Sequence, residues 1–188
     1  MKKGFIAVAV VALGLMMTSD LFAFERLYNP DFGDNGGSFT DVYCPSGTRL
    51  IGAAYFDLDE SADAISVVCE NKRGEHIIPK NSDWPEGGTN VVVEQTCDWR
   101  KGEALYAISY KDRDVTGKHK DAVDGVRVGC KMKNGSIRWS QNDDLNGGRN
   151  FTDIVNTSGK KILGISYKDG GCGGQGSDCV DAVTLITK

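Results

Sequence analysis

Three aspartates stand at equivalent positions of a pattern that recurs along the chain, and they are the first candidates for a chemical role. Asp63, Asp124 and Asp181 each follow a hydrophobic residue and precede a small residue and then a β-branched one. Carboxylates repeated in this way would accept hydrogen bonds from sugar hydroxyl groups. The alternative is that each aspartate accepts backbone N–H bonds in the turn entering a strand. Repetition favours the structural role, because a repeat preserves what the fold needs in every copy.

Trp99 and Asp98 form a second candidate site. They lie in the segment 97–101 (CDWRK), which has the composition of a polar turn. An indole ring offers apolar area to the face of a sugar and an N–H group as a hydrogen-bond donor. Tryptophans more often fill a core or cap the end of a sheet, and that is the alternative for Trp84 and Trp139. The polar setting of Trp99 argues against a core position.

A glycine-rich segment supplies the third candidate. Residues 170–176 read GGCGGQG, where the equivalent segments of the other copies carry charged residues. Glycines allow a backbone to approach a ligand closely. Gly173, Gly174 and Gln175 are therefore predicted ligand contacts. The alternative is a flexible loop that binds no ligand and is closed by a disulfide between Cys172 and Cys179.

All six cysteines follow the N-terminal apolar segment, and their even number indicates disulfide bonds rather than a metal site. The repeat narrows the possible connectivities, because one cysteine pair brackets the first copy and another brackets the second. The remaining pair flanks the glycine-rich segment. The predicted bonds are Cys44–Cys69, Cys97–Cys130 and Cys172–Cys179.

Catalytic and metal chemistry find little support in the sequence. His76 and His119 are the only histidines, and neither has a partner at metal-ligand spacing. No nucleophile-elbow, zinc-protease or phosphate-loop motif occurs. Asp-x-Asp pairs such as Asp57 and Asp59 lack the further ligands that a calcium loop needs. We therefore predict no catalytic residue, no metal and no cofactor.

Residues 1–23 have the features of a signal peptide, with a basic start, an apolar run from Phe5 to Met17 and a small residue, Ala23, at the predicted cleavage site. Residues 24–188 would then form the exported protein, either extracellular or periplasmic. No later apolar run is long enough to span a membrane. The formal net charge of −4 argues against nucleic acid as a partner.

The elements that would position these candidates follow from a threefold repeat. The strand-like segments LIGAAYFD (50–57), LYAISYKD (105–112) and ILGISYKD (162–169) align with one another, and each follows a Gly-Gly turn earlier in its copy. Alternating and β-branched runs predict an all-β domain over residues 24–188, with copies of about 55 residues at about 27–78, 79–138 and 139–188. Such copies favour a β-prism of three four-stranded sheets. The alternative is a β-trefoil.

Over nearly the whole of residues 24–188, this pattern resembles the vitelline membrane outer layer protein I family. The matching residues are Asn35-Gly36-Gly37, Cys44-Pro45-Ser46-Gly47 and Asp63-Ala64-Ile65-Ser66-Val67-Val68-Cys69, with partial counterparts in the second and third copies. The resemblance implies a β-prism related to jacalin-type lectins, and contacts with glycans or glycoproteins of extracellular coats. The second copy departs from it, with Cys97-Asp98-Trp99 where Cys-Pro is expected.

The hypothesis that combines these observations is a secreted, non-catalytic β-prism protein that binds a carbohydrate or a glycoprotein. An alternative is a protein-interaction module, such as an inhibitor or a toxin-associated domain. A second alternative is a carbohydrate-active enzyme that uses two carboxylates.

Overall fold

The computed structural model describes residues 24–29, 38–57, 62–81, 84, 91–112, 123–141, 151–169 and 180–188. The predicted signal peptide at residues 1–23 lies outside these ranges. Across the described residues, no helix has the length and apolar character needed to cross a membrane.

Almost every described element is a β-strand. In chain order the elements are β1 (Glu25–Arg26), β2 (Ser38–Tyr43), β3 (Arg49–Asp57), β4 (Ala62–Glu70), β5 (His76–Ile77), β6 (Val91–Thr96), the 3-10 helix η2 (Trp99–Lys101), β7 (Ala104–Asp112), β8 (Val123–Lys131), β9 (Ile137–Trp139), β10 (Phe151–Val155), β11 (Ile162–Asp169) and β12 (Val180–Thr187).

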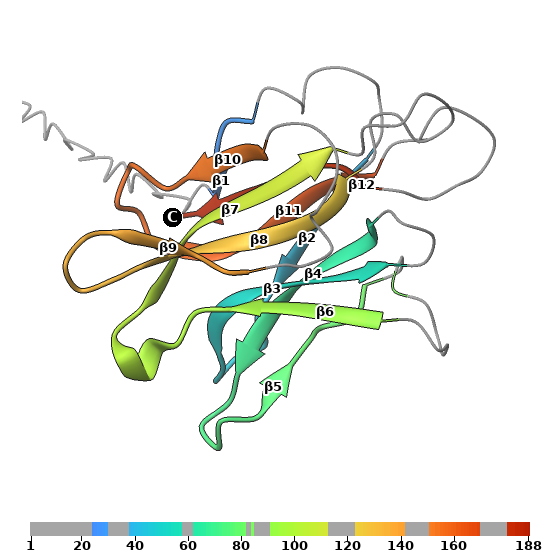
Figure 1. Cartoon of the computed structure of the whole chain (residues 1–188). Coiled ribbons are helices and arrows are strands. Elements are labelled where there is room, and N and C mark those ends of the chain that lie inside the picture. The colour runs from blue at the N-terminus through green and yellow to red at the C-terminus, as the bar shows by residue number, and fades with distance from the viewer. Residues whose placement is uncertain are drawn as a thin grey trace, which may run out of the picture.

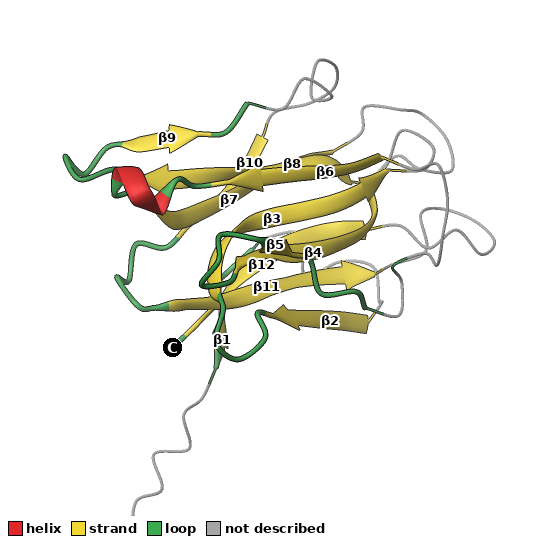
Figure 2. Cartoon of the chain, turned by 90° about the horizontal axis from the view of Figure 1, so that it is seen from below, coloured by secondary structure: helices red, strands yellow, loops and turns green. Residues whose placement is uncertain are grey.

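These strands form three four-stranded antiparallel sheets, which face one another around a shared interior (Figures 1 and 2). The strand orders are β5-β4-β3-β6, β10-β7-β8-β9 and β1-β12-β11-β2. The prediction of an all-β prism with a threefold repeat is therefore confirmed.

Each sheet is built on a central hairpin, and the three hairpins have the same register. Tyr55, Tyr110 and Tyr167 occupy the same position and are fully buried, opposite Ile65, Val126 and Val183. Each hairpin also has a register shift near its first residues and another near its far end. The three-fold similarity of the sequence is thus reproduced residue by residue in the strand pairing.

The first strand of each sequence copy pairs with the hairpin of another copy. β6 pairs with β3, β10 pairs with β7, and β2 returns to pair with β11. β1 adds to β12 on the other side of that last sheet. The N-terminal strands therefore close the sheet that contains the C-terminal hairpin, and no sheet consists of one continuous copy.

The interior is one hydrophobic cluster to which all three sheets contribute. A smaller cluster lies between Trp84 and the sheet of β3 and β4, where Trp84 packs with Phe56 at a ring separation of 5.9 Å. Trp84 is thus a buried residue, which agrees with the structural alternative for it.

Two predicted disulfides are confirmed, Cys44–Cys69 and Cys97–Cys130. Each joins the residue that follows an edge strand of one sheet to the central hairpin of the next sheet. The bonds therefore staple neighbouring sheets to each other. The predicted bond Cys172–Cys179 lies outside the described residues.

Candidate functional site

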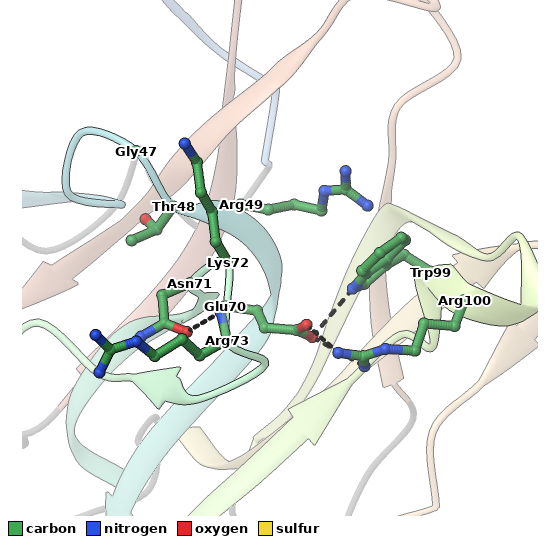
Figure 3. Close-up of a pocket in the computed structure, with 9 residues that line it drawn as sticks. All are labelled: Gly47, Thr48, Arg49, Glu70, Asn71, Lys72, Arg73, Trp99 and Arg100. Atoms are coloured by element: carbon green, nitrogen blue, oxygen red, sulfur yellow. Dashed lines mark hydrogen bonds and ion pairs between the residues drawn. The ribbon is translucent and has the colours of Figure 1, made fainter.

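The candidate site is a pocket of about 540 Å³ at one end of the prism. It lies where β3 begins and β4 ends, beside η2 (Figures 1 and 3). Its lining residues are Gly47, Thr48, Arg49, Glu70, Asn71, Lys72, Arg73, Trp99 and Arg100.

A short helical turn presents Trp99 to this pocket. Asp98 caps η2, because its carboxylate accepts a hydrogen bond of 3.1 Å from the backbone N–H of Arg100. The turn ends at Gly102, whose φ of 81° is a left-handed conformation that favours glycine. The hydrogen bond from the Lys101 ammonium holds the pKa of the Asp98 carboxyl below its usual value. Asp98, a predicted ligand contact, is thus engaged as the cap of the turn.

Glu70 fixes the orientation of the indole. Its side chain is only 5% exposed, and it accepts a hydrogen bond of 3.0 Å from Nε1 of Trp99 and one of 2.5 Å from Nη2 of Arg100. Figure 3 shows the Glu70 carboxylate pointing toward both side chains. A buried charge of this kind needs such partners, and here they lock Trp99 in place at the pocket.

The exposed part of Trp99 is flanked by guanidinium groups. Trp99 is 38% exposed. The guanidinium of Arg49 lies 4.0 Å from the centre of its ring, and that of Arg100 lies 5.0 Å from it. Both distances are typical of cation–π contacts. The indole therefore holds positive groups at the pocket as well as offering its own surface.

Two neutral polar side chains of the lining are already engaged in turns. The hydroxyl of Thr48 donates to the carbonyl of Pro45 at 2.7 Å. The Asn71 side-chain oxygen accepts from the backbone N–H groups of Arg73 and Glu75, and its amide donates to the Glu75 carboxylate. These bonds shape the pocket walls.

Glu103 attaches the Trp99 turn to the neighbouring sheet. It accepts from the backbone N–H of Asp98 at 2.8 Å, and Arg138 on β9 donates to both of its oxygens at 2.9 and 2.5 Å. The hydrogen bonds from Arg138 hold the pKa of the Glu103 carboxyl below its usual value. An adjoining pocket of about 310 Å³ contains Glu103, Leu50, Leu105 and Ile162 and shares Arg49 and Trp99 with the first.

The structure separates the three repeated aspartates from this pocket. Asp63, Asp124 and Asp181 lie at the register shift near the far end of each hairpin, where each is the extra residue of a β-bulge. All three are half-buried. A bulge that recurs in each sheet bends the strand at the same point. This place at the bulge explains why the aspartates recur in each copy. It does not indicate that they bind a ligand.

The glycine-rich candidates Gly173, Gly174 and Gln175 lie outside the described residues. Sequence reasoning missed Glu70, Arg49 and Arg100, which complete the surroundings of Trp99. Arg100 was visible as its chain neighbour. Glu70 carried no local signal, because it precedes Trp99 by 29 residues and meets it only through the packing of the sheets.

One group within the described residues has the spacing of metal ligands, namely Cys97, Glu103 and Cys130. The two cysteines form a disulfide with each other, and Glu103 is paired with Arg138. The disulfide and the ion pair therefore account for this cluster.

The sequence matches no protein-family model and no curated protein. Among solved structures it is similar to AcmJRL, a mannose-binding jacalin-related lectin from Ananas comosus, with 16% identity, a TM-score of 0.47, and coverage of 87% of this chain and 95% of that chain. It is also similar to single-chain recombinant jacalin, with 15% identity, a TM-score of 0.47, and coverage of 88% and 94%. A mannose-specific jacalin-related lectin from Morus nigra, in complex with mannose, shows 14% identity, a TM-score of 0.43, and coverage of 88% and 92%. At these identities and TM-scores the likeness carries no argument about the ligand of this chain.

Proposed function

We propose that this protein is exported and binds an extracellular glycan or glycoprotein at the Trp99 pocket, without catalysing a reaction. The observation that carries the proposal is the Trp99 indole, which is partly exposed and is held in one orientation by the buried Glu70. A rigid aromatic group at a pocket offers contact area at little conformational cost, and a saccharide supplies matching apolar faces and hydroxyl groups.

The size of the pocket suits this role. About 540 Å³ falls within the range of small-molecule sites in proteins. The lining combines one aromatic ring with donors from Arg49, Lys72 and Arg73. These groups would bond the oxygen atoms of a saccharide.

The carboxylate content of the described pocket lining supports binding rather than hydrolysis. Glycosidases use two carboxyl groups on opposite sides of the scissile bond. Among the described lining residues Glu70 is the one carboxylate, and it is buried and paired with Arg100. A carboxylate engaged in this way is poorly placed to act as an acid or a nucleophile.

Export is supported by the signal-like residues 1–23 and by the two inter-sheet disulfides. Disulfides of this kind persist in oxidising compartments. The resemblance to the vitelline membrane outer layer protein I family agrees with an extracellular role. Membership of that family remains a prediction, as does the bond Cys172–Cys179.

The test is a glycan panel probed with protein purified after expression of the full chain in an exporting host. Trp99→Ala is expected to weaken binding by roughly tenfold or more, since aromatic anchors commonly contribute over 1 kcal/mol. Tyr28→Ala is the matched control, because Tyr28 is 85% exposed and does not line the pocket. Absence of glycan binding, or equal binding by the Trp99→Ala variant, would contradict the proposal. A stable complex with a secreted protein that sugars do not displace would favour the interaction-module alternative.

A further inference from the structure

Charge is unevenly distributed over this acidic protein. The formal net charge is −4 and the isoelectric point is about 5.2. The turns at the pocket end are nevertheless rich in lysine and arginine. The basic residues of these described turns and of the adjoining strand ends are Arg49, Lys72, Arg73, Arg100, Lys101, Lys131, Lys133, Lys160 and Lys161.

Several carboxylates at this end are neutralised by neighbouring cations. Glu70 pairs with Arg100, Asp98 with Lys101, Glu103 with Arg138, and Glu25 with Lys160. In the described part of the chain, no carboxylate forms an ion pair with Arg49, Lys72, Arg73, Lys133 or Lys161. The exposed carboxylate of Glu75, in the same turn as Lys72 and Arg73, offsets one of these five charges, and the surface that they form stays net positive.

The donors that remain for a ligand in the pocket are mainly cationic. Thr48 and Asn71 use their polar atoms within turns, and Glu70 is paired. Arg49, Lys72 and Arg73 remain, and Lys72 and Arg73 extend away from Glu70 in Figure 3. Cationic donors at a shared site favour a ligand with negatively charged oxygen atoms.

The positive surface continues beyond the pocket. Arg49 also lines the adjoining pocket of about 310 Å³ and a third depression of about 500 Å³, and Lys161 lines both of these. On the other side of the Trp99 turn, the side chain of Lys133 lies against Gly102. The cations thus extend over turns that belong to all three sheets, farther than one anionic group reaches.

We infer that the pocket end of the prism binds an acidic polysaccharide, whose sulfate or carboxylate groups contact Arg49, Lys72 and Arg73 and extend toward Lys161. This inference rests on the proposed function and names the class of glycan. A polymer matches the spread of the cations, and its binding releases counterions, so that affinity falls with salt. A saccharide chain is favoured over nucleic acid because an exported protein meets acidic polysaccharides in its own compartment.

The experiment measures binding of the purified protein to four probes: heparin, polygalacturonate, neutral dextran and double-stranded DNA. Measurements at about 50 mM and about 200 mM salt determine the salt dependence. The expected result is binding to heparin or polygalacturonate that weakens by roughly tenfold or more at the higher salt, with no binding to dextran.

The central variant is Arg49→Gln/Lys72→Gln/Arg73→Gln, with an expected loss in affinity of roughly tenfold or more. The double variant Lys72→Gln/Arg73→Gln leaves the contact between Arg49 and Trp99 intact and is expected to show a smaller loss. The matched control, Arg113→Gln/Lys118→Gln/Lys120→Gln, changes the net charge equally. It leaves every described lining residue of the pocket unchanged. Binding by this control should equal that of the unmodified protein.

Each contrary outcome has a distinct meaning. If neutral glycans of the wider panel bind in a Trp99-dependent manner while heparin and polygalacturonate do not, this inference fails and the proposed function stands. If no glycan binds, both fail. Equal affinity and salt dependence for DNA and the acidic polysaccharides would overturn the assignment to a polysaccharide. Equal loss in the central and control variants would overturn the location.

Discussion

Glu103 links the turn that presents Trp99 to β9 of the neighbouring sheet. Its side chain is 6% exposed and receives two hydrogen bonds from Arg138 and one from the backbone of Asp98. Charge-assisted, two-pronged bonds between arginine and a carboxylate are among the stronger polar contacts in proteins. The position of the turn therefore depends on the ionised form of Glu103.

The expected consequence is a loss of stability in acid. Because the folded state lowers the pKa of Glu103, its contribution is present at pH values above the unfolded-state pKa of about 4.3. The contribution is lost as pH falls through the lower folded-state pKa. The free energy of unfolding, measured with urea from about pH 7 to about pH 3, should decrease toward acid.

Glu103→Gln should show a weaker decrease in stability toward acid than the unmodified protein. Some acid dependence should persist in this variant, since the folded state also lowers the pKa of Asp98. Glu75→Gln, a change at an exposed carboxylate that is not the partner of Arg138, is the control. Parallel pH profiles for the unmodified protein and Glu103→Gln would show that the ion pair does not contribute.

The surroundings of Trp99 were predictable only in part. The segment 97–101 indicated a surface turn, and the capping role of Asp98 is a local property that its spacing to Arg100 permits. The contact with Glu70 depends on how β4 packs beside η2. No local pattern encodes such a contact, so Glu70 could not be singled out from the sequence.

At the scale of elements, the disulfides occupy equivalent positions at two of the three junctions between sheets. Cys69 and Cys130 stand opposite Leu50 and Leu105 in their hairpins, and Thr187 stands opposite Ile162 in the third. Cys97 and Asn156 are also equivalent, because each donates its backbone N–H to the strand beside it, to Ile51 and Tyr106 respectively. The third junction therefore has Asn156 and Thr187 where the others have cysteines.

This equivalence predicts that Asn156→Cys/Thr187→Cys forms a third inter-sheet disulfide. The Cα atoms of the existing bonds lie 5.7 and 5.5 Å apart, which is within the usual range for disulfides. Relative to the reduced form of the same variant, the new bond should stabilise the protein by about 2–4 kcal/mol, mainly through the unfolded state. The reduced variant is the reference because the substitutions remove the side-chain hydrogen bonds of Asn156 to Lys160 and of Thr187 to Glu25. Mass spectrometry without reductant and urea denaturation provide the measurements. Each single cysteine variant is a control, and persistent free thiols in the double variant would show that the third junction is not equivalent.

A buried polar side chain, that of Asn29, helps to fix the segment after β1. Asn29 is 3% exposed, and its side-chain amide donates to the hydroxyl of Tyr110 and to the carbonyl of Val183, both at 2.9 Å. It thereby joins the N-terminal segment to strands of two sheets. This link adds to the pairing of β1 with β12 and to the hydrogen bonds of Leu27 with Leu185 and Thr184, which also hold the N-terminal segment to β12.

Asn29→Ala should lower the free energy of unfolding by about 1–3 kcal/mol, because it leaves the buried hydroxyl and carbonyl without this partner. The adjacent substitution Tyr28→Ala should change it by less than about 0.5 kcal/mol, since Tyr28 is largely exposed. Urea denaturation of both variants provides the comparison. Similar effects of the two substitutions would show that Asn29 does not anchor the segment.

For the whole molecule, the repeat was sufficient to predict a threefold all-β domain and to favour a β-prism over a β-trefoil. The in-register tyrosines Tyr55, Tyr110 and Tyr167 and the aspartates at the bulges mark equivalent positions in three hairpins. The exchange of first strands between sheets was not predictable, because a strand of a given pattern can pair with any hairpin of matching register. The concentration of positive charge at the pocket end was not predictable from the sequence either, because the turns that carry it are far apart along the chain.

The exchange of strands predicts that the protein unfolds in one cooperative step. In an extended repeat protein each unit contacts only its neighbours, and the ends can unfold separately. Here every sheet contains a strand from another copy, and one hydrophobic cluster joins all three sheets. Removing one copy would leave two sheets incomplete and expose that shared interior. Calorimetry should therefore show a single transition whose calorimetric and van't Hoff enthalpies agree. Resolved transitions, or a van't Hoff enthalpy near a third of the calorimetric value, would mean that the sheets unfold independently.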